Sequence, residues 1–306
     1  MFKKIILSVS ILFLLSSATF AGNWVDFYQA LRTAQKEEKL IILDFYTDWC
    51  GWCSRLKAEV FETSEFNKFA GDRFILTKVN AEKYVNLRKR YNVAGFPTVL
   101  ILNKYGQELD RVVGYAPYDK YTKMIEEAAY SLENFYNLKQ VVGTLERENR
   151  HINRMLGEKY MQRNDYKMAE FHLRKAIEID YRYTKAYIQL GHLFMRKGDV
   201  VEAGKFYEQA LKIEPDNFDI IFEAGYTAFT VRKYENAIEA FNAYINGKGN
   251  KEAEKINFSH YYRTVCAINL KNYELALIYL TEYRKLPGNE ENVEKIETHL
   301  KRMGVL

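Results

Sequence analysis

The sequence predicts two folded domains: an α/β domain with a mixed sheet flanked by helices, followed by an all-α repeat solenoid. Two observations predict this arrangement. Apolar runs typical of strands alternate with amphipathic helical segments up to about residue 131, and from residue 150 one pattern of small and aromatic residues returns every 34 residues. A chain of 306 residues is long enough to bury two hydrophobic cores.

Residues 1–21 have the composition of an export signal. Two lysines precede an apolar segment, residues 5–15, and small residues follow it up to Ala21. This order is typical of a secretory signal peptide, and the apolar segment is short for a membrane span. We therefore expect cleavage after Ala21, with Ala18 as the second choice, and no membrane span in the mature chain. An uncleaved N-terminal anchor is the alternative.

Charge and cysteine content narrow the classes of partner. Loss of residues 1–21 would lower the formal net charge from +5 to +3, because that segment holds two lysines and no acid. Basic and acidic residues are interspersed, so nothing indicates a nucleic acid or a membrane surface as partner. Three cysteines are too few for a disulfide-stapled scaffold. The pair Cys50 and Cys53 is therefore expected to be present for its chemistry.

The first predicted domain covers residues 22–131. Helical spacing of apolar residues predicts its helices, continuous apolar runs predict buried strands, and a turn at residues 103–107 predicts a hairpin. The expected elements in order are a helix at 23–36, a strand at 40–46, a helix from the cysteine pair, a strand at 74–79, a helix at 82–91, strands at 98–102 and 109–113, and a helix at 118–131.

Cys50 and Cys53 lie where the strand at 40–46 gives way to a helix. Unpaired amides and the helix dipole favour an anion at that position, so Cys50 is the expected thiolate. Cys53 is one turn further on the same side, close enough to close a short disulfide. Zinc is the competing chemistry, but Cys266 is distant and the histidines are scattered. We expect no metal and no cofactor beyond the redox-active disulfide.

The residues around the pair resemble the thioredoxin superfamily. Residues 44–53 read Asp-Phe-Tyr-Thr-Asp-Trp-Cys-Gly-Trp-Cys, and Gly-Phe-Pro-Thr at 95–98 and Gly114 complete the pattern. The segment is similar to the exported thioredoxin-like domains found in periplasmic electron transfer, over about residues 24–131. Trp52 replaces the usual proline and Ser54 a common basic residue, and both positions tune the thiolate and the reduction potential.

The resemblance implies a role for each matching residue. Cys50 attacks the substrate, and Cys53 resolves the mixed disulfide. Asp44, enclosed by apolar neighbours that raise a carboxyl pKa, would take the proton of the resolving thiol, with Lys78 as its accompanying lysine. Pro97 would be a cis-proline. The alternative for Asp44 is a charge satisfied by Lys78 and water, without a catalytic role.

The same resemblance implies a substrate-binding surface. A cis bond before Pro97 would expose the Phe96 backbone opposite the sulfurs, where a substrate strand can pair. The residues expected to contact substrate are Trp49, Gly51, Trp52, Phe96 and Pro97.

The second half of the chain resembles an array of tetratricopeptide repeats. Leu-Gly at 156–157 and alanines at 169 and 176 return 34 residues later. A fourth copy has Thr264 in place of the glycine and follows a five-residue insertion at 252–256. The expected segments are a helical linker at 132–149, repeats at 150–183, 184–217, 218–251 and 257–290, and a capping helix at 291–306.

Such arrays usually bind proteins on the concave face, formed by the first helix of each repeat. Here that face turns aromatic, and an apolar extended segment or a folded partner is expected on it. The expected contact residues are Phe222, Tyr226, Phe229 and Tyr261. The alternative is that these rings pack against a neighbouring repeat or the first domain. Cys266 is expected to be a buried apolar residue, with an intermolecular disulfide as the alternative.

The signal-like residues 1–21 and the two resemblances together imply an exported thiol:disulfide oxidoreductase, periplasmic or otherwise in the cell envelope. It would act on protein disulfides, as a reductase or isomerase rather than an oxidase, and receive electrons from an upstream thiol donor. The repeats would recruit client or donor proteins. The alternative is a non-catalytic assembly scaffold in which the cysteines are incidental.

Overall fold

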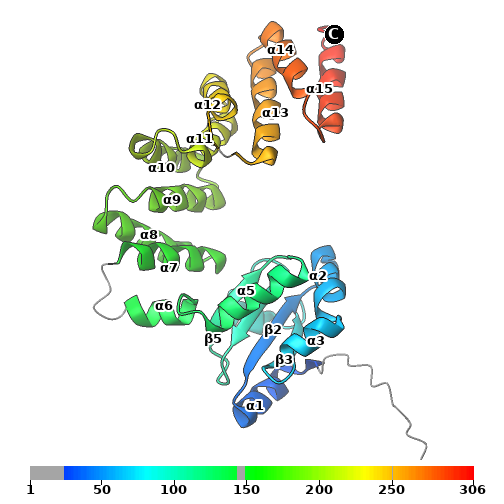
Figure 1. The fold of residues 1–306 in the computed structure, drawn as a ribbon, viewed down its shortest axis with the longest axis vertical. Coiled ribbons are helices and arrows are strands. Elements are labelled where there is room, and N and C mark those ends of the chain that lie inside the picture. The colour runs from blue at the N-terminus through cyan, green and yellow to red at the C-terminus, as the bar shows by residue number, and fades with distance from the viewer. Residues whose placement is uncertain (1–23, 143–148, 250) are drawn as a thin grey trace, which may run out of the picture. The chain divides into compact units, whose positions relative to one another are not determined.

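The computed structural model describes residues 24–142, 149–249 and 251–306. The chain divides between Asn134 and Phe135 into two compact units, and each is described by itself (Figure 1). The expected signal segment and part of the expected linker lie outside the described residues. Within the described ranges, no helix has the length and apolar character needed to cross a membrane.

The first unit is built on a five-stranded mixed sheet with the order β1-β3-β2-β4-β5. The strands are β1 (Trp24–Val25), β2 (Leu40–Tyr46), β3 (Phe74–Asn80), β4 (Thr98–Leu102) and β5 (Glu108–Val113). β2 lies at the centre, parallel to β3 and antiparallel to β4. Its apolar run is buried on both faces, as a central strand requires. The predicted mixed sheet is confirmed.

Helices cover both faces of this sheet (Figure 1). They are α1 (Phe27–Glu37), α2 (Gly51–Leu56), the π-helical segment η1 (Lys57–Phe61), α3 (Ser64–Ala70), α4 (Val85–Arg90) and α5 (Tyr118–Tyr130). The core under α2, η1, α3 and α5 includes Ile42, and the core under α1 includes Ile41 and Leu43. Because side chains alternate along a strand, Asp44 points to the same face as Ile42, which α2 and α5 cover.

The start of the first unit differs from the helix expected at 23–36. Trp24 and Val25 instead form a short strand beside β3, and the Trp24 ring packs 5.3 Å from that of Phe61. Helix α1 begins after Asp26, whose carboxylate accepts hydrogen bonds from two backbone N–H groups of the first turn at 2.9 and 3.3 Å. An N-cap aspartate satisfies donors that the first turn leaves unpaired, and this fixes the start of the helix.

The second unit is helical throughout its described residues. Its helices are α6 (Phe135–Val142), α7 (Arg150–Gln162), α8 (Tyr166–Ile179), α9 (Thr184–Lys197), α10 (Val200–Ile213), α11 (Phe218–Thr230), α12 (Tyr234–Asn246), α13 (Ala253–Asn269), α14 (Tyr273–Tyr283) and α15 (Glu290–Arg302). Successive helices pack closely at glycines: a Cβ added at Gly157 would lie 2.5 Å from Leu173, and one at Gly191 2.4 Å from the Tyr207 ring. The predicted all-α array is confirmed.

The pair α13 and α14 departs from the pairs before it. The insertion at residues 252–256 supplies the first turn of α13, which begins at Ala253 and is 17 residues long. Thr264 stands where the earlier pairs have glycine. Its side chain is buried, and its hydroxyl donates to the His260 carbonyl at 2.8 Å. This bond satisfies the hydroxyl within its own helix, so the core can hold a threonine there.

Candidate active site

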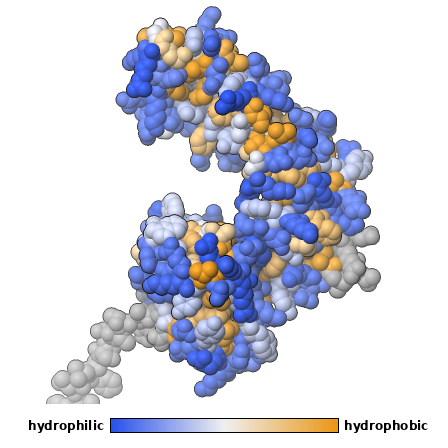
Figure 2. Space-filling model, turned by 180° about the vertical axis from the view of Figure 1, so that it is seen from behind, coloured by the Kyte–Doolittle hydropathy of each residue, from blue (hydrophilic) through white to orange (hydrophobic). Residues whose placement is uncertain are grey.

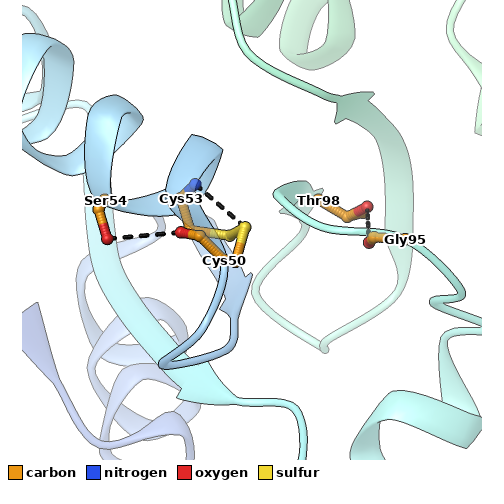
Figure 3. Close-up of a disulfide and its surroundings, with 5 residues drawn as sticks. All are labelled: Cys50, Cys53, Ser54, Gly95 and Thr98. Atoms are coloured by element: carbon orange, nitrogen blue, oxygen red, sulfur yellow. Dashed lines mark hydrogen bonds between the residues drawn. A yellow bond between two sulfur atoms is a disulfide. The ribbon is translucent and has the colours of Figure 1, made fainter.

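The cysteine pair lies where β2 leads into α2. Cys50 is the N-cap residue of α2, and Cys53 lies in its first turn. Their sulfurs form a disulfide with the Cα atoms 5.2 Å apart (Figure 3). The backbone N–H of Cys53 donates to Cys50 Sγ at 3.1 Å. This contact and the helix N-terminus both favour negative charge on Cys50 when the disulfide is reduced.

The loop before β4 lies beside the cysteine pair. The Phe96–Pro97 peptide bond is cis, as the resemblance implied. Thr98 pairs with Phe45 at the end of β2 that leads to Cys50, so the sheet register brings this loop to the site (Figure 3). The Thr98 hydroxyl donates to the Gly95 carbonyl at 2.8 Å, which closes the loop on itself.

Trp49 stands on the side of the site next to Phe96. Its side chain is 70% exposed, yet its position is fixed by two contacts. The indole N–H donates to Glu82 Oε1 at 2.9 Å, and the ring meets that of Phe96 edge-on at 6.2 Å. Gly51 is exposed, and a Cβ added there would have no atom within 4 Å, so the space over this residue is open.

Trp52 lies between the two cysteines in the sequence, and its side chain is 57% exposed. Its ring stacks on Tyr115 with the ring centres 5.5 Å apart. The guanidinium of Arg55 lies over both rings, 5.6 Å from the centre of Trp52 and 4.8 Å from that of Tyr115. Trp52, which replaces the usual proline, therefore forms an ordered aromatic surface together with Tyr115.

Asp44 is buried beneath this region, on the sheet face that α2 covers. Burial raises its pKa to about 7, and the charge of Lys78 opposes that shift. Among the described residues, Asp44 Oδ1 and the buried hydroxyl of Tyr121 have no hydrogen-bond partner. Burial, and secondly the charge of Asp44, raise the pKa of Tyr121. A carboxyl in this setting can hold or release a proton near neutral pH.

Lys78 is the register partner of Asp44 on β3. Its side chain is exposed, and its Nζ lies 5.5 Å from the centre of the Trp24 ring. Lys78 therefore acts on Asp44 through its charge from the surface, while the carboxyl remains buried.

The aromatic residues expected on the repeat groove lie on α11 and α13. Tyr226, Phe229 and Tyr261 are half-buried and gather around Tyr262, whose ring centre is 4.8 Å from that of Phe229. Phe222 differs, since it is 9% exposed and packs within the core of the array. Figure 2 shows hydrophobic side chains surfacing in separate patches along the second unit.

A family model described as a thioredoxin-like domain matches residues 27–129. Two models described as a tetratricopeptide repeat match residues 155–183 and 184–217. The chain carries a thioredoxin-like domain followed by tetratricopeptide repeats.

Individual relatives match the thioredoxin-like domain. Mitochondrial thioredoxin-2 of Schizosaccharomyces pombe is 39% identical over 92 residues, which are 30% of this chain and 65% of the relative. Disulfide bond reductase DsbH of Chlamydia pneumoniae is 29% identical over 107 residues, covering 31% of this chain and 64% of the relative. A solved DsbH oxidoreductase has a TM-score of 0.33 at 25% identity, covering 38% of this chain and 91% of that one. The chain spans less than two thirds of either curated relative.

Sequence reasoning missed several residues around the thioredoxin-like site. Tyr115, Arg55 and Glu82 contact the two exposed tryptophans, and Tyr121 is buried within reach of the charge of Asp44. The one available signal was the position of Tyr115 directly after Gly114, a residue of the thioredoxin pattern. The other contacts join segments far apart in the chain, so no local pattern marks them.

The described residues contain no group of three or more His, Cys, Asp or Glu side chains placed to hold a metal ion. Cys266 lies buried in α13 of the repeat array, as expected for an apolar core residue. Burial raises the pKa of its thiol to about 12. A thiol so placed stays protonated at neutral pH and is a poor nucleophile.

Proposed function

We propose that the chain is an exported thiol:disulfide oxidoreductase that acts on protein disulfides, as a reductase or isomerase. The observation that carries the proposal is the position of Cys50 at the N-terminus of α2, with the Cys53 N–H donated to its sulfur at 3.1 Å. This contact favours the thiolate, the form that attacks a disulfide. Similarity to proteins named thioredoxin and disulfide bond reductase supports it.

The reaction consists of two thiol–disulfide exchanges. In the reduced chain, the Cys50 thiolate attacks one sulfur of a substrate disulfide, forms a mixed disulfide, and releases the other substrate sulfur as a thiolate. The Cys53 thiolate then attacks Cys50 Sγ, which closes the Cys50–Cys53 disulfide and releases the second substrate thiolate. Two electrons pass to the substrate, and a thiol donor returns them by reducing the pair.

The second exchange requires that the Cys53 thiol lose its proton. Asp44 lies on the sheet face covered by α2, and its pKa of about 7 leaves both protonation states populated at neutral pH. Such a carboxyl is suited to accept this proton. Lys78 limits how far burial raises the pKa, which keeps the group in the useful range.

Reduction or isomerisation is favoured over oxidation on two grounds. Asp44, Lys78 and Gly51 together resemble the reducing branch of the thioredoxin superfamily, and one relative is named a disulfide bond reductase. The test is the reduction potential of the Cys50–Cys53 pair against a glutathione buffer. A value of about −270 mV supports reduction, and one of about −120 mV overturns it.

The proposal also covers location and recruitment. The order of charged, apolar and small residues in 1–21 supports export to the periplasm or another part of the cell envelope. The repeats support recruitment of a client or an electron-donor protein, because arrays of this kind bind proteins.

Thiol trapping in cells tests the proposal. A Cys53→Ala variant should accumulate mixed disulfides on Cys50, and a Cys50→Ala/Cys53→Ala chain is the control that should capture nothing. We expect the wild-type pair to be reduced at steady state and specific proteins to be captured. A fully oxidised pair without captured proteins, together with full activity in cells of the double variant, would support the scaffold alternative instead.

A further inference from the structure

Four side chains next to the cysteines form an ordered surface, which we call the Trp52 ledge: Trp52, Arg55, Glu59 and Tyr115. The rings of Trp52 and Tyr115 are inclined by only 28°. Arg55 lies over both rings and pairs with Glu59 at 2.8 Å. Glu59 also accepts a hydrogen bond from the Tyr115 hydroxyl. The exposed indole therefore contacts two side chains, Tyr115 and Arg55, and Glu59 binds both of these in turn.

The ledge is continuous with the cis-proline loop. Tyr115 follows Gly114, whose backbone N–H donates to the Pro97 carbonyl at 2.9 Å. On the other side of the loop, Phe96 contacts Trp49. A polypeptide that crosses the disulfide along Phe96 and Pro97 would therefore carry its neighbouring side chains onto Trp49 or onto the ledge.

We propose that the Trp52 ledge selects protein disulfides in which an apolar or aromatic side chain lies next to the attacked cysteine. This inference rests on the proposed function and names its substrate class. A large indole face that is exposed yet already ordered can stack on such a side chain with little loss of conformational entropy. Glu59 offsets the charge of Arg55, so the ledge offers no net charge to an acidic segment. Tyr115 is a positioning residue that acts through Trp52.

Two peptide disulfides test the ledge in the full-length chain. They are identical except that Phe flanks the cysteine in one and Ser flanks it in the other. We expect kcat/KM to favour the Phe peptide by about 5- to 20-fold, mainly through a lower KM. Trp52→Ala and Tyr115→Ala should bring the ratio to within about twofold of one.

Two further variants are controls for this ratio. Tyr115→Phe keeps the ring but loses the hydroxyl bonded to Glu59, so it should retain the preference. Tyr105→Ala removes another exposed aromatic residue, in the turn after β4 at the opposite end of that strand from Pro97. It should leave the ratio unchanged. A preference that survives both Trp52→Ala and Tyr115→Ala would overturn the proposal.

Binding without exchange separates this inference from the proposed function. In the Cys50→Ala/Cys53→Ala chain, the indole N–H signals of the three tryptophans are followed by NMR during titration with Ser-for-Cys versions of the peptides. The Trp52 signal should move with the Phe peptide and the Trp24 signal should not. If no disulfide reacts but the Trp52 signal still shifts, the proposed oxidoreductase function is contradicted and the proposed role of the ledge is supported. If exchange proceeds without a preference for the Phe peptide, or if the Trp52 signal does not shift, the proposed role of the ledge is contradicted.

Discussion

Asp44 occupies a position that costs folding free energy whenever its carboxyl is charged. Its ordinary pKa of 3.8 applies to the unfolded chain, and burial raises the value to about 7 in the folded domain. The stabilisation from the protonated form is therefore complete below about pH 3.8 and is lost as the pH rises through about 7. An unpaired buried charge is tolerated in a core mainly where it has a task.

Asp44→Asn should stabilise the thioredoxin-like domain in a pH-dependent way. The gain in free energy of unfolding should be near zero at pH 3 and reach about 2–4 kcal/mol above pH 7, because asparagine cannot take on the charge. Tryptophan fluorescence during urea unfolding measures it, since Trp24, Trp49 and Trp52 all lie in this domain. Asp72→Asn, at an exposed acid, is the control. An equal gain at pH 3 and pH 8 would contradict the argument.

The same substitution should distinguish the two hypotheses for Asp44, a proton acceptor for Cys53 and a charge without a catalytic role. If Asp44 accepts the Cys53 proton, resolution of a preformed mixed disulfide should accelerate with pH around 7 in the wild type, and Asp44→Asn should slow it about 10- to 100-fold at pH 7 and remove this rise. Rapid-quench analysis of a single turnover measures the step. An unchanged pH profile in the variant would favour the reading in which Asp44 has no catalytic role.

The paired helices of the repeat array pack closely against each other at small residues. In α9, the Cα of Gly191 faces the ring of Tyr207 in α10, and that ring is fully buried. A larger residue would force the helices apart or push the ring off its rotamer. The small residues of the 34-residue pattern therefore set the distance between paired helices.

Gly191→Ala should destabilise the repeat array by about 1–3 kcal/mol, because its Cβ would lie 2.4 Å from the Tyr207 ring. Far-UV circular dichroism during urea unfolding measures the loss. Gly204→Ala in α10 is the matched control, since its Cβ would meet only Thr227 Cγ2 at 3.2 Å. A stable Gly191→Ala chain would show that the helix pair can adjust at little cost.

Local patterns made much of the fold and site predictable from the sequence. The break from an apolar strand to a helix located Cys50 and Cys53, and the repeat period located the helix pairs. The strand at Trp24 was missed because its partner is distant in the chain and two residues give no period. The Trp52 ledge was missed for a similar reason, since its stacking partner Tyr115 lies on a separate segment.

The sequence did not settle which aromatic side chains of the repeat helices are exposed and which are buried, because this depends on the phase of each helix. Adjacent positions on a helix point about 100° apart, so a small error in phase moves a side chain from an open face into the core. Phe222 proved to be buried against the rings of Phe241 and Tyr244. Tyr262, rather than Tyr261, lies at the centre of the aromatic cluster, on the helix that the insertion lengthens.

For the whole molecule, the proposed function assigns chemistry to one unit and recruitment to the other. Phe258 of α13 is 39% exposed and borders the cluster around Tyr262. In a Cys53→Ala background, Phe258→Ala should lower the yield of mixed disulfides with cellular proteins about 3- to 10-fold, because a partner would lose an apolar contact. Quantitative mass spectrometry of captured proteins measures it.

The control for recruitment is Phe171→Ala, which removes an exposed aromatic side chain from α8, outside that cluster. It should leave the set of captured proteins and their yield unchanged. Equal yields from the Phe258→Ala and Phe171→Ala chains would indicate that clients reach Cys50 without binding the aromatic cluster around Tyr262.

The arrangement of Trp49 and Trp52 around the cysteines gives the chain an intrinsic optical signal. A disulfide quenches the emission of an indole beside it, and the chain has three tryptophans, of which two neighbour the cysteines in sequence. Reduction should therefore brighten the emission, over a steady background from Trp24, which packs against Phe61. Stopped-flow measurement of the tryptophan emission would then follow electron transfer to and from Cys50 and Cys53 in real time, without a label or a coupled assay.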